Sequence, residues 1–518
     1  MRSHSVIPSV RMVACLVLTT LLVACGSATT APATTAPATT PTPAATGGTL
    51  RVAYGLWWGG AESIDPLSAV PFLDAVNILY DRLVRLDATG KLVPELATAW
   101  SANADATVWT FTLREGVTFH NSAPFTSADV AYSIKRLLDP AQEAGLAGIY
   151  QIIKQIETPD PRTVVFTLAQ PHAELPVLFT IYRAAIIPAE SSASIAQTGI
   201  GTGAFQLAQL NPTGTTRMTA YAKSWRGAPK LDAIELIGIA DADARFQALQ
   251  AGQIDVLLET SPQQLTALKD NPAFVVQTFP GGIWYSLTMR TDTPPFNDVR
   301  VRRALRLLVD RQQILTLVQQ GMGSIACDTT VWSGDPYRWQ GSCPQDLAQA
   351  RKLLAEAGYP NGLDLTLFTS DSLSGMTPLA EVYQQQAALA GVRVTIKQVP
   401  ADSYWTETYG VEPFVIDGEY QYPADLSLHL FYGKGGGYNV SKFDDPAFEQ
   451  LLAEARATLD PQQRSQRYQQ AQQYLLEQDG TIIPFHANEE FSFSRRVAGL
   501  QTVPYIDMRW DLVTLAAK

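Results

Sequence analysis

The stretch Val108–Pro140, VWTFTLREGVTFHNSAPFTSADVAYSIKRLLDP, indicates the fold class. Apolar and polar residues alternate over 108–114, which predicts a β-strand with one buried face. The turn Phe119–Pro124 then leads into a predicted helix that is capped by Thr126 or Ser127. A strand followed this closely by a helix is typical of an α/β protein.

The same two patterns recur along the chain. Residues 48–53 and 163–168 alternate and predict further strands. Asp298 precedes a long segment, 299–320, whose apolar residues follow helical spacing. The sequence therefore predicts a helix over 299–320 that ends at Gly321. Further helices are predicted after acidic N-caps, namely Asp346, Asp445 and Asp460. Because strands and helices interleave throughout, the sequence predicts the α/β class.

Size and charge exclude several classes of protein. The 518 residues exceed the size at which one core stops growing, so two or more lobes are expected. The net charge is −11, and such an acidic body lacks the basic stripe that nucleic acid requires. No segment after the N-terminal region has 18 consecutive apolar residues, so no later membrane span is expected.

The N-terminal region has the pattern of an export signal. A basic flank precedes the 13 apolar or small residues Met12–Ala24, which are too few for a spanning helix, and residues 1–24 are expected to be a signal peptide. The tetrapeptide that ends at Cys25 resembles the lipobox of bacterial lipoproteins, and this resemblance implies that Cys25 carries lipid. The alternative is ordinary secretion with an incidental cysteine. Residues 25–47 contain, after Cys25, only Gly, Ser, Ala, Thr and Pro, which predicts a disordered linker.

Two cysteines remain for the folded body. Cys327 and Cys343 are separated by 15 residues of a loop rich in Gly, Asp and Ser. In an exported chain such a pair favours a disulfide, which could add about 3 kcal/mol by restricting the unfolded chain. The alternative is two free buried thiols.

The sequence contains no recognisable catalytic motif. The four histidines of the body stand in no zinc-binding or C-x-x-C arrangement, and no nucleophile elbow is present. The glycine-rich stretches at 199–203 and 433–437 match no phosphate loop. We therefore expect no enzyme activity, no metal and no cofactor. The four histidines are His120, His172, His429 and His486.

A series of segments spread along the body forms a recognisable pattern. These pieces are Ile64-Asp65-Pro66, LYDRLVRLDATGKLVPELATAW from Leu79, the stretch Val108–Pro140, GTGAFQL from Gly201, KLDAIELIGIADADARFQALQAGQIDV from Lys230, PPFNDVRVRRAL from Pro294, ARKLLAEAGYPNG from Ala350 and YNVSKFDDPAFEQLLAEA from Tyr438. In order and spacing, over about residues 48–500, they resemble the extracellular solute-binding proteins of family 5, which bind dipeptides, oligopeptides or nickel for ABC importers.

The resemblance implies a two-lobed, periplasmic-binding-protein-like (type II) α/β fold with an extra inserted subdomain in lobe I. By that pattern, lobe I uses residues 48–82, 196–280 and 481–518. The inserted α/β subdomain covers 83–195, and lobe II covers 281–480.

The resemblance also implies a function. The protein would enclose oligopeptides or similar solutes by hinge closure and deliver them to an ABC permease and its ATPase. It would act as a monomer on the outer face of the cytoplasmic membrane, held by the lipid anchor, which raises its concentration near the permease. The alternatives are a ligand receptor for a membrane sensor and a lipoprotein hydrolase.

Several ligand-binding residues are expected from the resemblance. Trp57 and Trp58 follow the first strand, where relatives contact ligand, and glycines beside them leave room for close approach; the alternative is that one of them packs in the core. Trp405 and Tyr422 are further candidates.

The loop 417–425 resembles the one whose Asp pairs with the ligand ammonium in peptide-binding relatives. Counting back from Pro423 places Glu419 there, followed by Tyr420, while Asp417 or Asp425 could play the same part. The alternative is a solvated acid. The stretch Ser370–Gly375 lacks the Arg that holds the peptide carboxylate in dipeptide-binding relatives, so longer peptides or a ligand that is not a peptide are favoured.

Overall fold

The computed structural model of the protein describes residues 47–56, 58–139, 147–503 and 507–516. The expected signal peptide, Cys25 and most of the predicted linker lie outside the described residues, and so does Trp57. Among the described residues, no helix has the length and apolar character that a membrane span requires.

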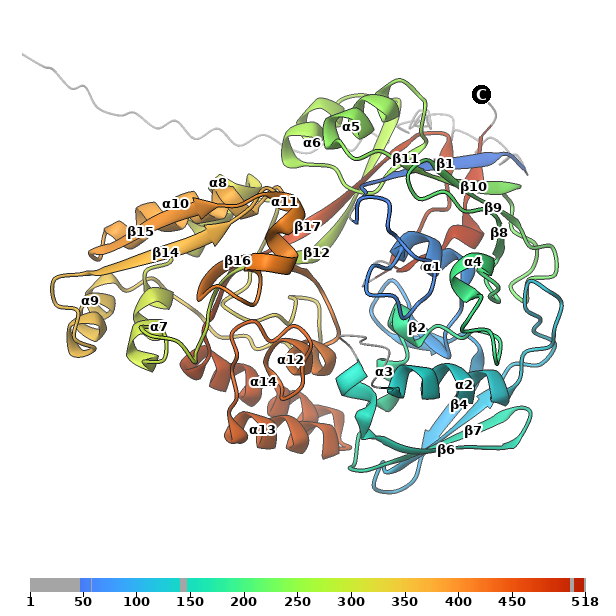
Figure 1. Cartoon of the computed structure of the whole chain (residues 1–518), viewed down its shortest axis with the longest axis horizontal. Helices are drawn as coiled ribbons and strands as arrows, with labels where there is room; N and C mark the ends of the chain where they lie inside the picture. Colours follow the sequence, from blue (N-terminus) through green and yellow to red (C-terminus); the bar gives the residue numbers. More distant parts are fainter. Residues whose placement is uncertain (1–46, 57, 140–146, 504–506, 517–518) are drawn as a thin grey trace, which may run out of the picture. The chain divides into compact units, whose positions relative to one another are not determined.

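A large mixed sheet runs through the described residues (Figure 1). Its order of pairing is β15-β14-β16-β12-β17-β11-β1-β10-β9-β8, with β13 paired to β17 in addition. The strands are β1 (Thr49–Tyr54), β8 (Phe205–Gln209), β9 (Thr215–Ala220), β10 (Ala233–Gly238), β11 (Val256–Leu257), β12 (Phe274–Met289), β13 (Gly323–Ile325), β14 (Leu363–Thr369), β15 (Val392–Gln398), β16 (Phe414–Tyr420) and β17 (Thr481–Ser494).

Two long antiparallel strands join the halves of this sheet. β12 pairs with β16 on one side and with β17 on the other, and β17 continues to β11. The β12–β17 register shifts between Phe279 and Ile283 and again between Tyr285 and Leu287. The first shift contains Pro280, Gly281 and Gly282, residues that interrupt a ladder because proline lacks a donor and glycine is conformationally free.

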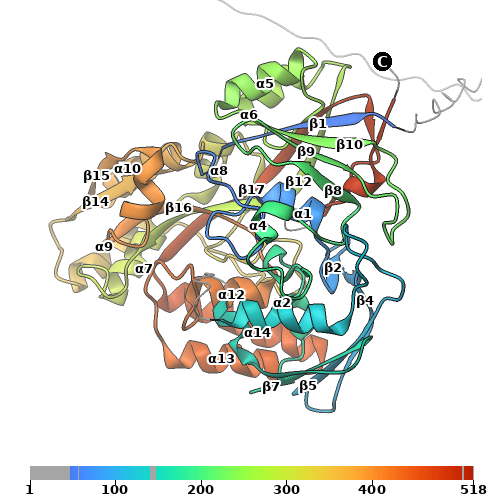
Figure 2. The same cartoon turned by 45° about the vertical axis from the view of Figure 1, so that its right-hand side comes forward.

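The segment 83–195 carries a separate four-stranded sheet, ordered β4-β5-β7-β6 (Figure 2). Its strands are β4 (Ala97–Ala102), β5 (Val108–Leu113), β6 (Ile153–Asp160) and β7 (Thr163–Leu168), and α2 (Ser127–Leu138) packs on them. The predicted strands at 108–114 and 163–168 are thus confirmed. The helix predicted after the turn is also confirmed, since Thr126 and Asp129 form a capping box at its start.

The remaining helices include the three that acidic caps predict. The Asp346, Asp445 and Asp460 side chains each accept a hydrogen bond from a backbone N–H in the first turn. The helices are α1 (Leu73–Leu79), α3 (Leu175–Leu178), α4 (Ile195–Thr198), α5 (Ala242–Gln250), α6 (Pro262–Leu268), α7 (Val299–Leu307), α8 (Arg311–Gln319), α9 (Leu347–Glu356), α10 (Met376–Ala388), α11 (Ala401–Ser403), α12 (Ala424–Tyr432), α13 (Pro446–Ala457) and α14 (Pro461–Gln478).

The single helix predicted over 299–320 is wrong, because the segment forms α7 and α8 with a break at 308–310. Asp310 caps α8 by accepting a hydrogen bond from the Gln313 backbone N–H at 2.9 Å. A cap inside an apolar periodic segment starts a new helix without disturbing the spacing, which explains why the pattern looks continuous.

Cys327 and Cys343 are joined by a disulfide, with 5.4 Å between their Cα atoms. The bridge lies beside a buried ion-pair cluster. Asp328 contacts Arg306 at 3.1 Å and Arg311 at 2.5 Å, and Arg311 also donates to the Cys343 carbonyl at 2.9 Å. Covalent and ionic contacts therefore hold the same loop.

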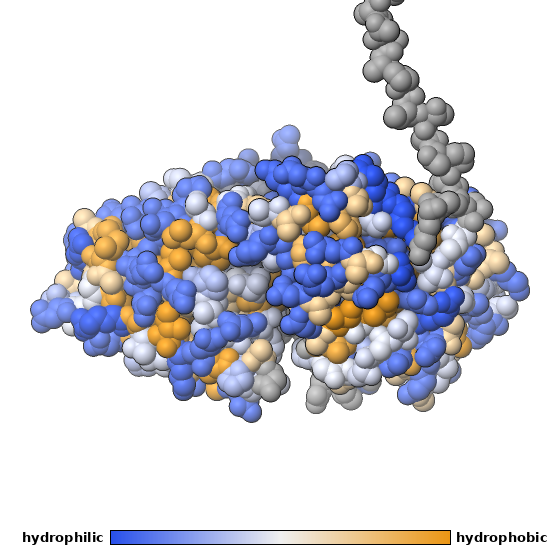
Figure 3. All heavy atoms as spheres, turned by 90° about the horizontal axis from the view of Figure 1, so that it is seen from above, coloured by the Kyte–Doolittle hydropathy of each residue, from blue (hydrophilic) through white to orange (hydrophobic). Residues whose placement is uncertain are grey.

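Buried apolar residues fall into separate clusters. One lies around β1, β8–β10 and α1, and a second around β12, β14–β16 and α7–α10. A third joins 83–195 to α12–α14, where Phe111 meets Phe166 and Phe179 with ring centroids 5.5 Å apart. Outside these clusters, polar residues cover most of the face seen in Figure 3, and apolar side chains appear there only as separate patches.

Candidate ligand-binding cavity

A cavity of about 800 Å³ lies beside the two joining strands, where Ile283 and Tyr285 of β12 and residues 487–490 of β17 line it. One wall is formed by the loop after β1 and the starts of α5 and α6. The other wall is formed by residues 371–374, the α11 region and the end of β16. In the sheet order these walls lie on opposite sides of β12 and β17, and the volume is that of a small-molecule site.

Aromatic side chains supply much of the apolar lining. Trp58, Tyr285, Trp405 and Tyr420 all face the cavity. Trp58 is 40% exposed, and its backbone N–H donates to a Glu62 carboxylate oxygen at 3.0 Å. Large rings of this kind offer contact area to ligands of varied shape. Three of the residues expected from the sequence, Trp58, Trp405 and Tyr420, therefore lie together.

Trp405 is fixed by other aromatic rings. Its ring centroid lies 5.2 Å from that of Tyr404 and 5.2 Å from that of Tyr409, both in edge-on arrangements. Tyr404 is fully buried, so the indole is held from the protein side while its remaining surface borders the cavity. A ring held in this way loses little conformational freedom when a ligand binds.

Asp417, Glu419 and Tyr422 are not among the residues that line this cavity. Asp417 is 2% exposed, and burial raises its pKa to about 7. The Tyr409 hydroxyl donates to the Glu419 carboxylate at 3.0 Å, while burial and the nearby Asp417 raise the pKa of Glu419 well above its usual value. Tyr422 is half-buried against Phe431, with ring centroids 6.2 Å apart.

Three glutamates that the sequence reasoning missed line the cavity: Glu259, Glu489 and Glu490. The Glu259 side chain is 46% exposed, yet partial desolvation at the cavity wall, together with the neighbouring Asp74, raises its pKa to about 7 despite the nearby Arg245. Burial and Glu259 raise the pKa of Glu489 to about 8. Glu489 and Glu490 could have been noticed in the sequence, because they are two adjacent acids in an otherwise mostly apolar strand, TIIPFHANEEFSFS.

Glycine makes room for one of these acids. A Cβ atom at Gly282 would overlap the side chain of Glu489. Because Gly282 belongs to the first register shift between β12 and β17, the same irregularity that interrupts the ladder gives the Glu489 side chain its space.

Three of the four histidines of the body have structural partners. His120 contacts the Gly203 carbonyl at 3.1 Å, and His486 contacts the Thr329 carbonyl at 2.9 Å. His172 contacts Asp425 at 3.1 Å, and Asp425 also binds Arg456 at 2.7 Å, which links 83–195 to α12 and α13. The described residues hold no group of three or more His, Cys, Asp and Glu side chains placed to bind a metal ion.

This fold and its cavity place the protein among type II periplasmic binding proteins. A solved periplasmic binding protein, DppA from Helicobacter pylori in complex with the peptide STSA, superposes with a TM-score of 0.79 at 25% identity, covering 91% of this chain and 99% of that one. The family model "Bacterial extracellular solute-binding proteins, family 5 Middle" matches residues 91–439, and the chain belongs to this family.

Two curated relatives cover most of the chain. The probable di/tripeptide-binding protein 5 of Pseudomonas aeruginosa is 27% identical over 496 residues, which covers 86% of this chain and 91% of the relative. The glutathione-binding protein GsiB of Escherichia coli is 28% identical over 466 residues, covering 85% and 90%. Members of this family are binding proteins that act in the periplasm or outside the cell.

Proposed function

We propose that this protein is the extracytoplasmic substrate-binding component of an ABC importer and that it catalyses no reaction. The observation that carries the proposal is the cavity of about 800 Å³ beside β12 and β17 in a chain of this family. Its relatives are named for di- and tripeptides and for glutathione, so peptides or similar small solutes are the proposed cargo. A permease and its ATPase are the proposed partners of a monomer.

The proposed mechanism is enclosure by movement of two lobes. Lobe I would comprise 48–82, 196–280 and 481–518, with 83–195 inserted, and lobe II would comprise 281–480. The support is that β12 and β17 connect the two sides of the cavity and that their pairing is irregular at 279–283. Strand irregularities concentrate bending, so this segment is the proposed hinge.

The ligand contacts proposed here combine two groups of residues. Trp58, Trp405 and Tyr420 line the cavity and would pack on the body of the solute. Glu419, Asp417 and Tyr422 do not line the cavity. Glu419 stays a predicted partner of a ligand ammonium, with Asp417 and Tyr422 beside it, and closure of the two lobes would bring the ligand to these residues.

The proposed location is the outer face of the cytoplasmic membrane, with Cys25 lipidated. Metabolic labelling with a clickable fatty acid should mark the wild-type chain and leave Cys25→Ser unmarked. Equal labelling of both chains would contradict the anchor and leave the binding function standing.

Native mass spectrometry tests the binding function. The mature chain, purified without denaturation and then exposed to a mixture of small peptides and metabolites, should gain the mass of a small solute. Denaturation and refolding should release that solute, and adding it back should raise the melting temperature. A chain that gains no mass from any mixture and melts at an unchanged temperature would contradict the proposed function.

A further inference from the structure

The cavity is lined by more acidic than basic side chains. What we infer from this excess rests on the proposed binding function. Glu259, Glu489, Glu490 and Asp371 line the cavity, while Arg245 is the one basic side chain among its described lining residues. Asp74 and Glu62 lie close by, since Asp74 acts on the titration of Glu259 and Glu62 binds the Trp58 backbone. A solute that enters therefore meets an excess of carboxyl groups.

Arg245 compensates little of this excess. Its guanidinium donates to the carbonyls of Ile239 and Ala240 at 2.7 and 2.8 Å, and it lies 3.7 Å from Glu259. The Arg245 side chain is only 7% exposed, so its remaining surface is small. The guanidinium of Arg245 is therefore already hydrogen-bonded within the cavity wall, and few of its N–H groups are left to bind an anionic ligand.

The three glutamates differ in their partners. The Thr278 hydroxyl donates to Glu490 at 2.6 Å, and Glu259 has its long contact with Arg245. For Glu489, no hydrogen bond or ion pair reaches the carboxyl group within the described part of the chain, and its charged neighbour is Glu259. Glu489 is half-buried at this wall, so its carboxyl group loses part of its hydration without gaining a protein donor, and the arrangement suits a ligand that supplies the missing donor.

We propose that this cavity selects cationic, amine-bearing solutes, with an ammonium group held between Glu259 and Glu489. Charge-assisted hydrogen bonds to two carboxylates are among the strong polar contacts that proteins make. Trp58, Trp405 and Tyr420 then receive the apolar or aromatic body that carries the amine, and the ring faces also favour a cation.

The opposite end of the cavity supports the same ligand class. The lining residues 371–374 carry no basic group, and the Asp371 carboxylate is hydrogen-bonded by Thr377 at 2.7 Å and Gln398 at 2.5 Å. A ligand carboxylate directed there finds no cation and faces an acid. Solutes without a free carboxylate, such as amines and peptide amides, are therefore preferred over anionic ones.

Titration of the acids gives the proposal a second readout. Asp74, Arg245, Tyr285 and Tyr420 are the groups whose charges or hydroxyls surround Glu259 and Glu489. The raised pKa values, about 7 for Glu259 and about 8 for Glu489, mean that the empty cavity retains protons at neutral pH. An ammonium that binds between them displaces those protons, so binding should release protons and should tighten as pH rises towards 8.

The test uses the mature chain and two sources of ligand. Immobilised wild type, Glu489→Gln and Glu259→Gln proteins are exposed to the small-molecule fraction of yeast extract, and the retained solutes are identified by mass spectrometry. A matched probe set follows: a phenylalanine–lysine dipeptide amide, its diacetylated neutral form and a phenylalanine–glutamate free acid. Glu477→Gln serves as the control, because the Glu477 side chain is 59% exposed on α14 and outside the cavity.

The proposal expects cationic solutes to dominate the retained fraction and the dipeptide amide to bind at least tenfold more tightly than its neutral form. Both cavity variants should lose about tenfold of that preference, and the control should keep it. Retention of neutral or anionic solutes that is unchanged in Glu489→Gln would overturn the proposal while supporting the binding function. Retention of no solute by any of the proteins would contradict the proposal and the binding function together.

Discussion

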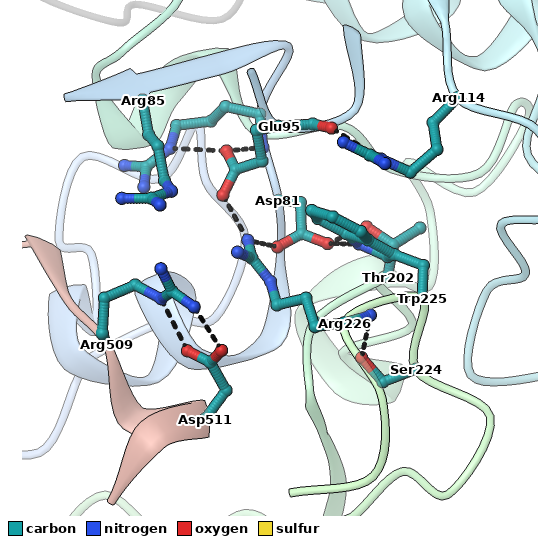
Figure 4. A network of polar contacts seen from close by, with 12 residues as sticks. Asp81, Arg85, Glu95, Arg114, Thr202, Ser224, Trp225, Arg226, Arg509 and Asp511 are labelled. Atoms are coloured by element: carbon teal, nitrogen blue, oxygen red, sulfur yellow. Dashed lines mark hydrogen bonds and ion pairs between the residues drawn. The ribbon is translucent and has the colours of Figure 1, made fainter. Parts of the chain in front are cut away.

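Two acid-rich regions of this protein differ in whether their carboxyl groups have hydrogen-bonding partners. In the network drawn in Figure 4, Asp81 accepts hydrogen bonds from Arg226 at 2.6 Å, from the Trp225 indole at 2.7 Å and from Thr202 at 2.9 Å. Arg226 also binds Glu95. In the cavity, by contrast, Glu489 has another acid, Glu259, as its charged neighbour and receives no hydrogen bond from the described residues.

The pKa shifts follow this difference in pairing. Burial alone would raise the pKa of Asp81, but Arg226, Trp225 and Thr202 together hold it below its usual value. Burial and a like charge instead raise the pKa of Glu489 to about 8. Paired acids stabilise a fixed arrangement, whereas unpaired acids in a cavity cost stability until a cation arrives.

Removing the shared cation should give the largest effect. Arg226→Leu leaves Asp81 and Glu95 buried without their common partner, which should lower the free energy of unfolding by about 3–5 kcal/mol. Chemical denaturation measures this loss. The matched control is Arg393→Ala, since Arg393 and its partner Asp364 are 57% and 75% exposed, and it should cost less than about 1 kcal/mol. Equal losses in the two variants would mean that the buried network around Arg226 contributes no more to stability than an exposed ion pair.

The two regions should also give stability a pH dependence of opposite sign. The folded pKa of Glu489, about 8, exceeds its ordinary value of 4.5, so the folded state binds more protons in that window and stability falls as pH rises through it. The lowered pKa of Asp81 acts in the other direction, since its contribution is present above about pH 4 and is lost on further acidification.

Glu489→Gln should therefore raise the free energy of unfolding of the ligand-free protein near pH 8 by about 1–3 kcal/mol and flatten the alkaline side of the profile. Denaturant titrations across the pH range measure the free energy of unfolding on the acidic and the alkaline side. If this free energy falls as steeply with rising pH in the variant as in the wild type, the cavity acids do not cause the fall.

Much of the fold follows from local sequence, whereas the acidic cavity does not. The strands at 108–113 and 163–168 and the caps at Asp346, Asp445 and Asp460 depend on residues close in the chain, which local patterns capture. The break at Asp310 was missed because its helical spacing continues across it.

The cavity acids depend on contacts that no local pattern carries. Glu259 follows β11 and Glu489 lies in β17. The β11–β17 pairing and the hydrogen bond from the Thr260 N–H to the Glu490 carbonyl bring these distant segments together. Trp58, Trp405 and Tyr420 could be chosen as aromatic residues in expected loops, yet their common site needed the fold. Counting along the chain from Pro423 selects Glu419 as a candidate, but it does not predict that the Tyr409 hydroxyl donates a hydrogen bond to the Glu419 carboxylate.

Glu419 and Glu489 are competing candidates for the carboxylate that holds a ligand ammonium. Glu419→Gln should weaken binding of peptides with a free N-terminal amine at least tenfold, about 1.4 kcal/mol, if its carboxylate pairs with the ammonium on closure. Isothermal titration with free and N-acetylated peptides measures this. Unchanged affinities for both peptides would leave Glu259 and Glu489 as the cation partners and would exclude Glu419.

The smallest expected effect comes from the aromatic wall. Trp58→Phe keeps an apolar ring but reduces its area, which should weaken solute binding by about 0.5–1 kcal/mol, a few-fold. Ligand-dependent quenching of tryptophan fluorescence should shrink in this variant, with Trp100→Phe as a control away from the cavity. Quenching that persists unchanged in Trp58→Phe and in Trp405→Phe would place the solute elsewhere.

Proton release on binding distinguishes a cation held by the cavity acids from an uncharged ligand. Calorimetric titration of the wild-type protein with the phenylalanine–lysine dipeptide amide near neutral pH, in two buffers that differ in ionisation enthalpy, gives the number of protons exchanged. We expect a net release on the order of one proton, reduced in Glu489→Gln, because an ammonium replaces protons held by Glu259 and Glu489. Binding with no proton release, or with a release that Glu489→Gln leaves unchanged, would contradict this expectation.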